Sequence, residues 1–100
     1  MTLGQTQRKF AGLIGQLLVY IYSKGYEVTF GDAWAKTGHK ANSNHYIRLA
    51  IDLNLFKDGN WLQDTEDHRE FGEYWESLGG AWGGRFKDGN HYSMEYEGRK

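Results

Sequence analysis

The sequence contains neither cysteine nor proline. Without cysteine, the chain has no disulfide bonds, no thiolate zinc sites and no cysteine nucleophile. Strong charge of either sign is also missing, because 12 basic residues stand against 13 acidic ones and the formal net charge is −1. We therefore expect no nucleic-acid partner, since general nucleic-acid binders carry a clear positive excess. The balance also differs from that of an acidic, disordered segment.

Long apolar segments are missing too. The longest uncharged run, residues 10–23, is shorter than the roughly 20 residues that a membrane span needs. It lacks a small-residue cleavage site, which argues against a signal peptide. We interpret it as part of a core-facing helix, and we expect no stable membrane insertion and no export signal.

Aromatic residues and glycine are abundant instead. Trp, Tyr and Phe make up 16% of the chain, and there are 14 glycines. At this length we expect one domain over residues 1–100. Sixteen aromatic rings, each able to bury roughly 150–250 Å², suffice for its core. Glycine at about twice the usual share of roughly 7% indicates several tight backbone positions.

The order of hydrophobic and turn-forming residues predicts an α+β fold. A first helix begins at Thr2 or Thr6 as N-cap and ends near Lys24, before Gly25. An Asp-Gly pair at 58–59 predicts a hairpin. The further predicted elements are a strand at 26–30, a loop at 31–43 with one helical turn at 32–36, a strand at 46–56, a helix at 65–78, a glycine-rich loop at 79–90 and a strand at 91–96. The result is a small, mostly antiparallel sheet with two main helices.

An acidic residue lies in the middle of the best predicted strand. Asp52 shares the strand face of Tyr46, Arg48 and Ala50, opposite an aliphatic face. A carboxylate at a strand centre is costly unless it is paired or bound to a metal. One interpretation is an ion pair with Arg48, and the other is a metal site.

Two histidines and a second acid can complete such a site. His45, Asp52 and His91 form a three-ligand set suited to zinc, with the fourth position open to water. Asp88, three residues before His91, can then act as general base. In a fully extended strand His45 would lie roughly 20 Å from Asp52, so a bend or bulge near Tyr46 is required.

These residues carry a family resemblance. The segment 43–52, SNHYIRLAID, resembles the Ser-x-His-x-x-x-x-Ala-x-Asp motif of the zinc D-alanyl-D-alanine carboxypeptidase and L-alanyl-D-glutamate peptidase family. The segment 88–91, DGNH, is similar to that family's Asp/Glu-x-x-His. The runs 53–59, LNLFKDG, and 82–86, WGGRF, are similar to the phage endolysin branch. The resemblance covers roughly residues 5–96.

The resemblance implies a role for each matching residue. It implies Zn²⁺ as cofactor, bound by His45, Asp52 and His91, with Asp88 as the base. It also implies the hedgehog/DD-peptidase-like fold. Ser43 matches the motif serine, either as a hydrogen-bond donor that orients a ligand at the substrate site or as a loop cap.

One departure from the family concerns substrate binding. Many members carry an arginine shortly after the first strand, whereas residues 31–36 read GDAWAK. Arg48 is our first candidate to replace it, or else it only pairs with an acid. Lys36, Lys40 and Arg85 are weaker candidates.

For three further residues we favour a structural interpretation over a functional one. We expect His39 to be solvated rather than to contact substrate. His68 lies in a charged run typical of a solvated helix face. Trp82 fits the core slightly better than the wall of a cleft.

The function that the resemblance implies is hydrolysis of the peptide stems of bacterial peptidoglycan. The endolysin-like runs favour a monomeric L-alanyl-D-glutamate endopeptidase that acts in bacteriophage host lysis. Such an enzyme is made in the host cytoplasm without a signal peptide and reaches the cell wall in the periplasm after release. The alternatives are a D-alanyl-D-alanine carboxypeptidase and a non-catalytic, zinc-stabilised wall-binding domain.

Overall fold

Helix α1 (Leu3–Ser23) begins where the sequence offers its first cap. In the computed structural model, which describes residues 1–100, the Thr2 hydroxyl accepts the Gln5 N–H and the Gln5 side chain accepts the Thr2 N–H. This reciprocal pair selects Thr2 over Thr6 as the N-cap. Gly25, with φ of 86°, ends the helix as predicted. Neither α1 nor α2 (Arg69–Ser77) has the combination of length and apolar composition that a membrane-spanning helix requires.

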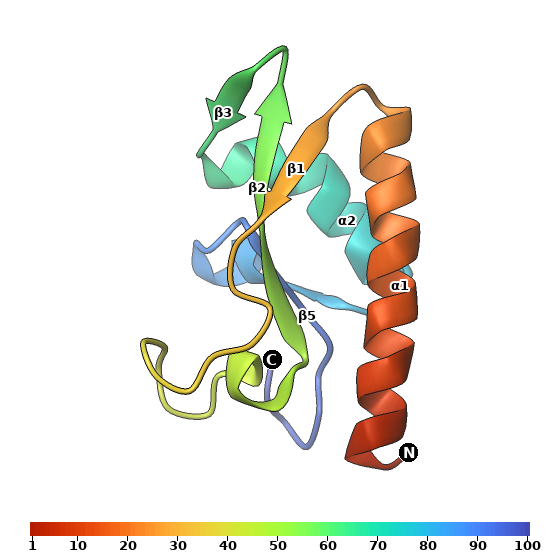
Figure 1. The fold of residues 1–100 in the computed structure, drawn as a ribbon, viewed down its shortest axis with the longest axis vertical. Helices are drawn as coiled ribbons and strands as arrows, with labels where there is room; N and C mark the ends of the chain where they lie inside the picture. Colours follow the sequence, from red (N-terminus) through yellow and green to blue (C-terminus); the bar gives the residue numbers. More distant parts are fainter.

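Five strands form one antiparallel sheet, which confirms the predicted α+β class (Figure 1). They are β1 (Glu27–Phe30), β2 (Ala50–Lys57), β3 (Asn60–Leu62), β4 (Ala81–Trp82) and β5 (His91–Ser93). Strand β2 is the central strand. Its C-terminal half pairs with β1 on one edge and β3 on the other, and its N-terminal half pairs with β5, which pairs with β4. Strands β3 and β5 therefore lie along the same edge of β2.

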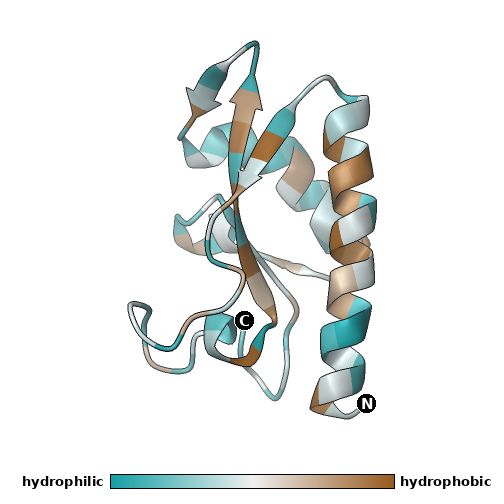
Figure 2. Cartoon of the chain, viewed as in Figure 1, coloured by the Kyte–Doolittle hydropathy of each residue, from teal (hydrophilic) through white to brown (hydrophobic).

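The core lies between the helices and the inner face of β2. Alternate residues of the strand, Ile51, Leu53 and Leu55, are buried there against aliphatic and aromatic side chains of α1 and α2. Figure 2 shows the corresponding hydrophobic bands on α1 and β2. Trp75 of α2 is fully buried and donates its indole N–H to the Ser93 carbonyl at 2.8 Å. This packing leaves the opposite face of β2 free for polar side chains.

The predicted hairpin is confirmed, with a two-residue loop. Lys57 pairs with Asn60, and Asp58 and Gly59 between them have φ angles of 52° and 80°. Both angles lie in the left-handed region that such hairpin turns require. The aspartate–glycine pair is therefore a sufficient local signal for this turn.

The predicted strand at 46–56 is wrong at its start. Residues Asn44–Ile47 form a 3₁₀ helix, η1, and β2 begins only at Ala50. Arg48 adopts a left-handed conformation with φ of 57° between them. Side-chain caps, rather than hydrophobic spacing, satisfy the backbone of this turn. The alternating pattern therefore runs through the turn without marking it.

Other boundaries also differ from the sequence predictions. The second helical segment is a 3₁₀ turn, η2 (Thr65–His68), followed by α2, and residues 32–36 contain no helical turn. The glycine-rich loop contains β4 and a third 3₁₀ helix, η3 (Gly83–Phe86). The last strand ends at Ser93 rather than at residue 96. Each difference concerns a short element or the end of one.

Candidate metal centre

The turn before β2 is built by two polar side chains. The Ser43 hydroxyl caps η1 by accepting the His45 N–H at 3.2 Å, so Ser43 takes the loop-cap role. The buried Asn44 amide donates to the carbonyls of Met94 and Arg99 at 2.9 and 3.1 Å. These bonds fix His45, which is 1% exposed, over the first residues of β2. The bend that the sequence required near Tyr46 is therefore present as η1 and the left-handed residue after it.

The register of β2 and β5 brings the second histidine to the same place. Asp52 lies directly opposite His91 in the antiparallel pair. Residues opposite each other in a sheet project their side chains to the same face. His91 is 5% exposed, and the Asp52 side chain is 20% exposed. Three potential ligands from η1, β2 and β5 thus meet on the outer face of the sheet.

The three side chains converge on one carboxylate oxygen. His45 Nε2 lies 3.2 Å from Asp52 Oδ1, and His91 Nδ1 lies 3.7 Å from the same oxygen. The remaining ring nitrogens, His45 Nδ1 and His91 Nε2, are buried without a hydrogen-bond partner. Protein–protein hydrogen bonding therefore leaves this cluster only partly satisfied.

The electrostatics of the cluster favour an ionised carboxylate. Burial alone would raise the pKa of Asp52, but the hydrogen bonds and charges of His45 and His91 outweigh it and lower the pKa to about 2. Asp52 is thus an anion at neutral pH. Arg48 does not supply the compensating charge, so the simple ion pair considered from the sequence is not formed.

A cation fits these residues. Tetrahedral zinc, with ligand bonds of about 2.0–2.2 Å, holds neighbouring ligand atoms about 3.3 Å apart. The spacings of 3.2 and 3.7 Å around Asp52 Oδ1 match this requirement. Two imidazoles and one carboxylate are also a donor set that zinc prefers.

A second acid borders the cluster. Asp88 Oδ2 lies 3.9 Å from His91 Nδ1, and the Asp88 side chain is 51% exposed. Its backbone is held by bonds from its N–H to Gly83 and from the His91 N–H to its own carbonyl, at 2.9 and 3.1 Å. Asp88 therefore combines a fixed backbone with a solvent-accessible carboxylate.

Two glycines allow the segment of Asp88 and His91 to pack closely. A Cβ at Gly83 would collide with the Asp88 carbonyl and lie 2.6 Å from the His91 Cβ. A Cβ at Gly89 would lie 2.6 Å from the Thr65 Cα. The requirement at Gly89 is thus close packing against η2 rather than a special backbone angle.

A cleft of about 450 Å³ opens over this cluster. Lys40 is its one non-histidine cation, with its ammonium 5.0 Å from the centre of the Phe86 ring. The lining residues are Gly38, His39, Lys40, Ser43, His45, Phe86, Asp88 and His91. The cleft therefore gives a ligand access to His45, His91 and Asp88 together.

His39 is closer to the site than the sequence indicated. Its ring stacks on the His45 ring with centroids 4.1 Å apart, and its Nε2 lies 2.9 Å from Asp32 Oδ2. The ligand atoms that all lie within 4.8 Å of one another are those of His39, His45 and Asp52, a group that does not include His91. We favour His91 as third ligand because the Nε2 of His39 is engaged by Asp32. No spacing signal marked His39, which is positioned by hydrogen bonds of its backbone to the Tyr46 hydroxyl.

Arg48 does not share the face of Asp52 as predicted. Because it precedes β2 in a left-handed conformation, its guanidinium lies over the Trp34 ring, 4.7 Å from the ring centre. It is not among the residues that line the cleft. Arg85 is bound by the Glu76 carboxylate at 2.6 and 2.9 Å.

The expectations for His68 and Trp82 have opposite outcomes. His68 is 2% exposed and lies 2.8 Å from the Tyr92 hydroxyl, so the solvated position predicted for it is wrong. Trp82 is 1% exposed and donates to the Gly89 carbonyl at 2.7 Å, which confirms the core position.

The comparison with protein families matches this geometry. The model of the family described as D-alanyl-D-alanine carboxypeptidase matches residues 37–94, which include His45, Asp52, Asp88 and His91. No curated protein matches the chain. The match extends over more than half of the sequence and over both motifs. The chain belongs to this family of zinc peptidases.

Proposed function

We propose that this protein is a zinc peptidase that hydrolyses peptide bonds in the stem peptides of peptidoglycan. The single observation that supports this most strongly is the convergence of His45 Nε2 and His91 Nδ1 on Asp52 Oδ1. We assign these three residues as zinc ligands. Zinc bound by such a set supplies Lewis acidity that activates water and polarises a carbonyl.

We assign Asp88 as the general base. Its carboxylate reaches the solvent in the cleft, whereas that of Asp52 is occupied by two histidines. Asp88 takes a proton from the attacking water and later passes it to the amine that leaves. The position of its carboxylate, 3.9 Å from His91 Nδ1, supports this role, which requires no fourth protein ligand.

Lys40 is the favoured contact for a carboxylate of the substrate. It lines the cleft, and its ammonium is paired with the face of Phe86 rather than with an acid. A carboxylate on the peptide can therefore bind this ammonium without breaking an ion pair. Substrate binding by Arg48 or Ser43 stays a prediction.

Within this activity we favour the bond between L-Ala and D-Glu, cut during host lysis by a monomeric phage endolysin. The resemblance of residues 53–59 and 82–86 to the endolysin branch supports this choice. The second candidate is removal of terminal D-Ala, which the description of the matching family favours. We propose that residues 1–100 form the catalytic domain and that it acts on the wall after release from the cytoplasm.

Mass spectrometry of purified peptidoglycan after digestion tests the proposal. New amino-terminal D-Glu on the fragments is expected for the endopeptidase, and loss of one D-Ala from pentapeptide stems for the carboxypeptidase. Unchanged fragments, from protein that contains one zinc per chain, would overturn both and favour a non-catalytic wall-binding domain.

A further inference from the structure

A second hollow lies beside the metal centre, on the edge of β2 that β3 and β5 share. The first residue of β5, His91, pairs with Asp52, and the last residue of β3, Leu62, pairs with Leu55. The two strands therefore leave a gap along this edge, where β3 stands above the segment that leads into β5 (Figure 1). A hollow of about 210 Å³ occupies the gap.

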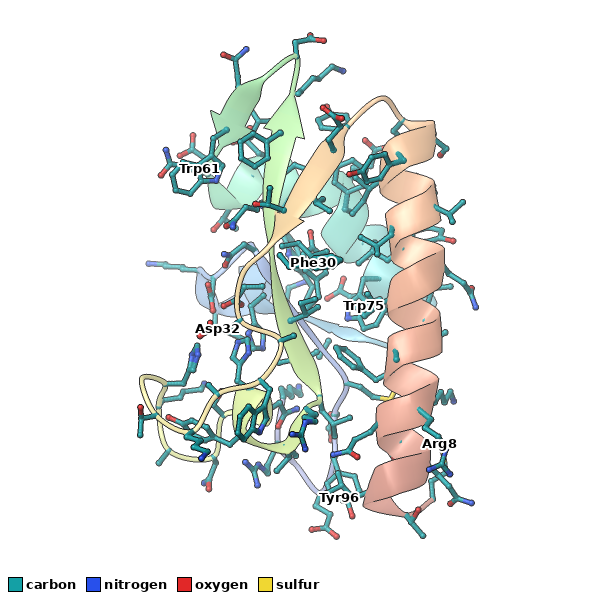
Figure 3. The ribbon with its side chains drawn as sticks, in the orientation of Figure 1. Arg8, Phe30, Asp32, Trp61, Trp75 and Tyr96 are labelled. Atoms are coloured by element: carbon teal, nitrogen blue, oxygen red, sulfur yellow. The ribbon has the colours of Figure 1, made fainter.

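No charged side chain lines this hollow, although a quarter of the chain is charged. Its polar groups are the amides of Asn54, Gln63 and Asn90. Trp61 borders it and is 54% exposed, with one ring face stacked on Phe56 at 6.4 Å between centroids. Figure 3 shows Trp61 on the side of β2 away from α1, whereas Trp75 lies between β2 and α1. An exposed aromatic ring beside neutral amides suits a ligand with apolar faces and many uncharged hydrogen-bonding groups.

His68 contributes a buried polar edge to the same hollow. Its Nδ1 is bonded to the Tyr92 hydroxyl at 2.8 Å, so Nε2 is the ring nitrogen left for a ligand. Burial lowers the pKa of His68 to about 4, and the ring is neutral at pH 7. The hollow is thus uncharged on every side that its lining residues form.

The residues that line the hollow are neighbours of those at the proposed active site. Asn54 follows Asp52 by two residues on the same face of β2, which corresponds to about 7 Å. Asn90 directly precedes His91, and its carbonyl accepts the Leu53 N–H at 2.9 Å. A ligand in the hollow is therefore within one or two residue lengths of a peptide bound at the cluster.

We propose that this hollow is a subsite for an N-acetylated sugar of the glycan strand to which the peptide stem is attached. This inference rests on the proposed function, because the glycan is the part of that substrate that carries uncharged hydroxyl and acetamido groups. The apolar face of a pyranose ring packs on Trp61. Its hydroxyl and acetamido groups bond to the Gln63 amide and to Oδ1 of Asn54, whose Nδ2 already donates to the Thr29 hydroxyl at 3.2 Å.

Binding is tested with a peptide-free probe, the tetramer of N-acetylglucosamine, added to the zinc-loaded protein. The chain has four tryptophans, and so four indole N–H signals in a nitrogen-15 correlation spectrum. The Trp61 signal should shift on titration. Those of the core residues Trp75 and Trp82 should not, because their N–H groups are bonded to carbonyls.

Trp61→Ala should weaken tetramer binding at least about tenfold, as expected for a central aromatic contact. Trp34→Ala is the matched control, because Trp34 is also exposed, at 43%, but lies in the loop before η1. It should leave binding unchanged. No shift of the Trp61 signal, or equal weakening by the two variants, overturns the subsite.

Hydrolysis separates this inference from the proposed function. Trp61→Ala should retain, within about twofold, the wild-type rate on a free stem peptide that carries no sugar. On intact peptidoglycan it should lose about three- to tenfold. Equal losses on both substrates overturn the sugar subsite. Wild-type protein that binds the tetramer but cuts neither substrate overturns the proposed peptidase and leaves the sugar subsite standing.

Discussion

The buried histidines of the metal centre and the buried histidine beneath the sheet edge have different partners. His45 and His91 are 1% and 5% exposed, and both face the anionic Asp52 while one nitrogen of each ring has no partner. His68 is 2% exposed, but it bonds to the neutral hydroxyl of Tyr92. Burial is therefore the same in the two regions, and the partner decides what each histidine is available to do.

The difference has an energetic reason. A histidine that has found a neutral partner in the interior is favoured in its uncharged form, since burial penalises the charge. Two histidines that point at one carboxylate instead bring ring lone pairs next to its negative charge, at a point that a cation can occupy. Each of the following predictions separates these two environments.

Loss of a proposed ligand should have the largest effect. His91→Ala removes one of three zinc ligands, so zinc content should fall from about one per chain to near zero, with loss of hydrolysis. His68→Gln is the matched control and should retain zinc, since His68 is bonded to Tyr92 and is not one of the three proposed ligands. Metal analysis after dialysis measures both. Full zinc in His91→Ala, together with full zinc in His45→Ala, would refute the ligand assignment.

Loss of the acid near His91 and loss of the acid next to His68 should have very different effects on turnover. Asp88→Asn keeps the shape of the side chain but removes the proposed base, so zinc should stay bound while turnover falls by roughly 10²–10⁴-fold. Asp67→Asn, next to His68, should keep turnover within about twofold, because the Asp67 carboxylate only accepts the Asp64 N–H at the start of η2. Zinc and turnover are measured on the same preparations. Loss of zinc in Asp88→Asn would make Asp88 a ligand, and full turnover would place the base elsewhere.

The ease of predicting each region from sequence follows from the range of its interactions. The first helix and the hairpin were predictable because Thr2, Gly25 and Asp58 act on neighbours in the chain. The motif resemblance nominated the cluster. The turn after Ser43 was not predictable in detail, since η1 depends on bonds from Asn44 to a segment 50 residues later.

The burial of His68 was missed for a similar reason. A charged run around it is typical of a solvated helix face, and two of its charged neighbours, Glu66 and Glu70, are exposed. His68 is the buried residue of the run because it bonds to the hydroxyl of Tyr92, which lies 24 residues later in the chain. The orientation of Arg48 likewise depends on Trp34, a contact that alternation along a strand does not encode.

Acid should reveal the difference between the histidines as a loss of stability. The pKa of His68 is lowered from about 6.5 in the unfolded chain to about 4 by burial, so the unfolded state takes up the proton first as pH falls. This contribution is complete above about pH 6.5 and is lost between pH 6.5 and 4, by about 3 kcal/mol in the free energy of unfolding.

Urea unfolding of metal-free protein at several pH values measures this loss, with His68→Gln as reference. Every other residue is the same in the two proteins, so the difference between their pH dependences isolates His68. Between pH 6.5 and 4, the free energy of unfolding of the variant should fall by about 3 kcal/mol less than that of the wild type. Parallel slopes would mean that His68 is not neutral in the folded protein.

Removal of the partner of His68 should have the smallest effect. Tyr92→Phe leaves the buried Nδ1 of His68 without its only protein partner, and we expect a loss of about 1–2 kcal/mol in the free energy of unfolding. Zinc content should stay at that of the wild type, although Tyr92 is the neighbour of His91, because the hydroxyl points to the other face of the sheet. In the His68→Gln background the same change should cost less, since the pair is already broken. An equal cost in both backgrounds would assign the effect to general packing around Tyr92 and not to its bond with His68.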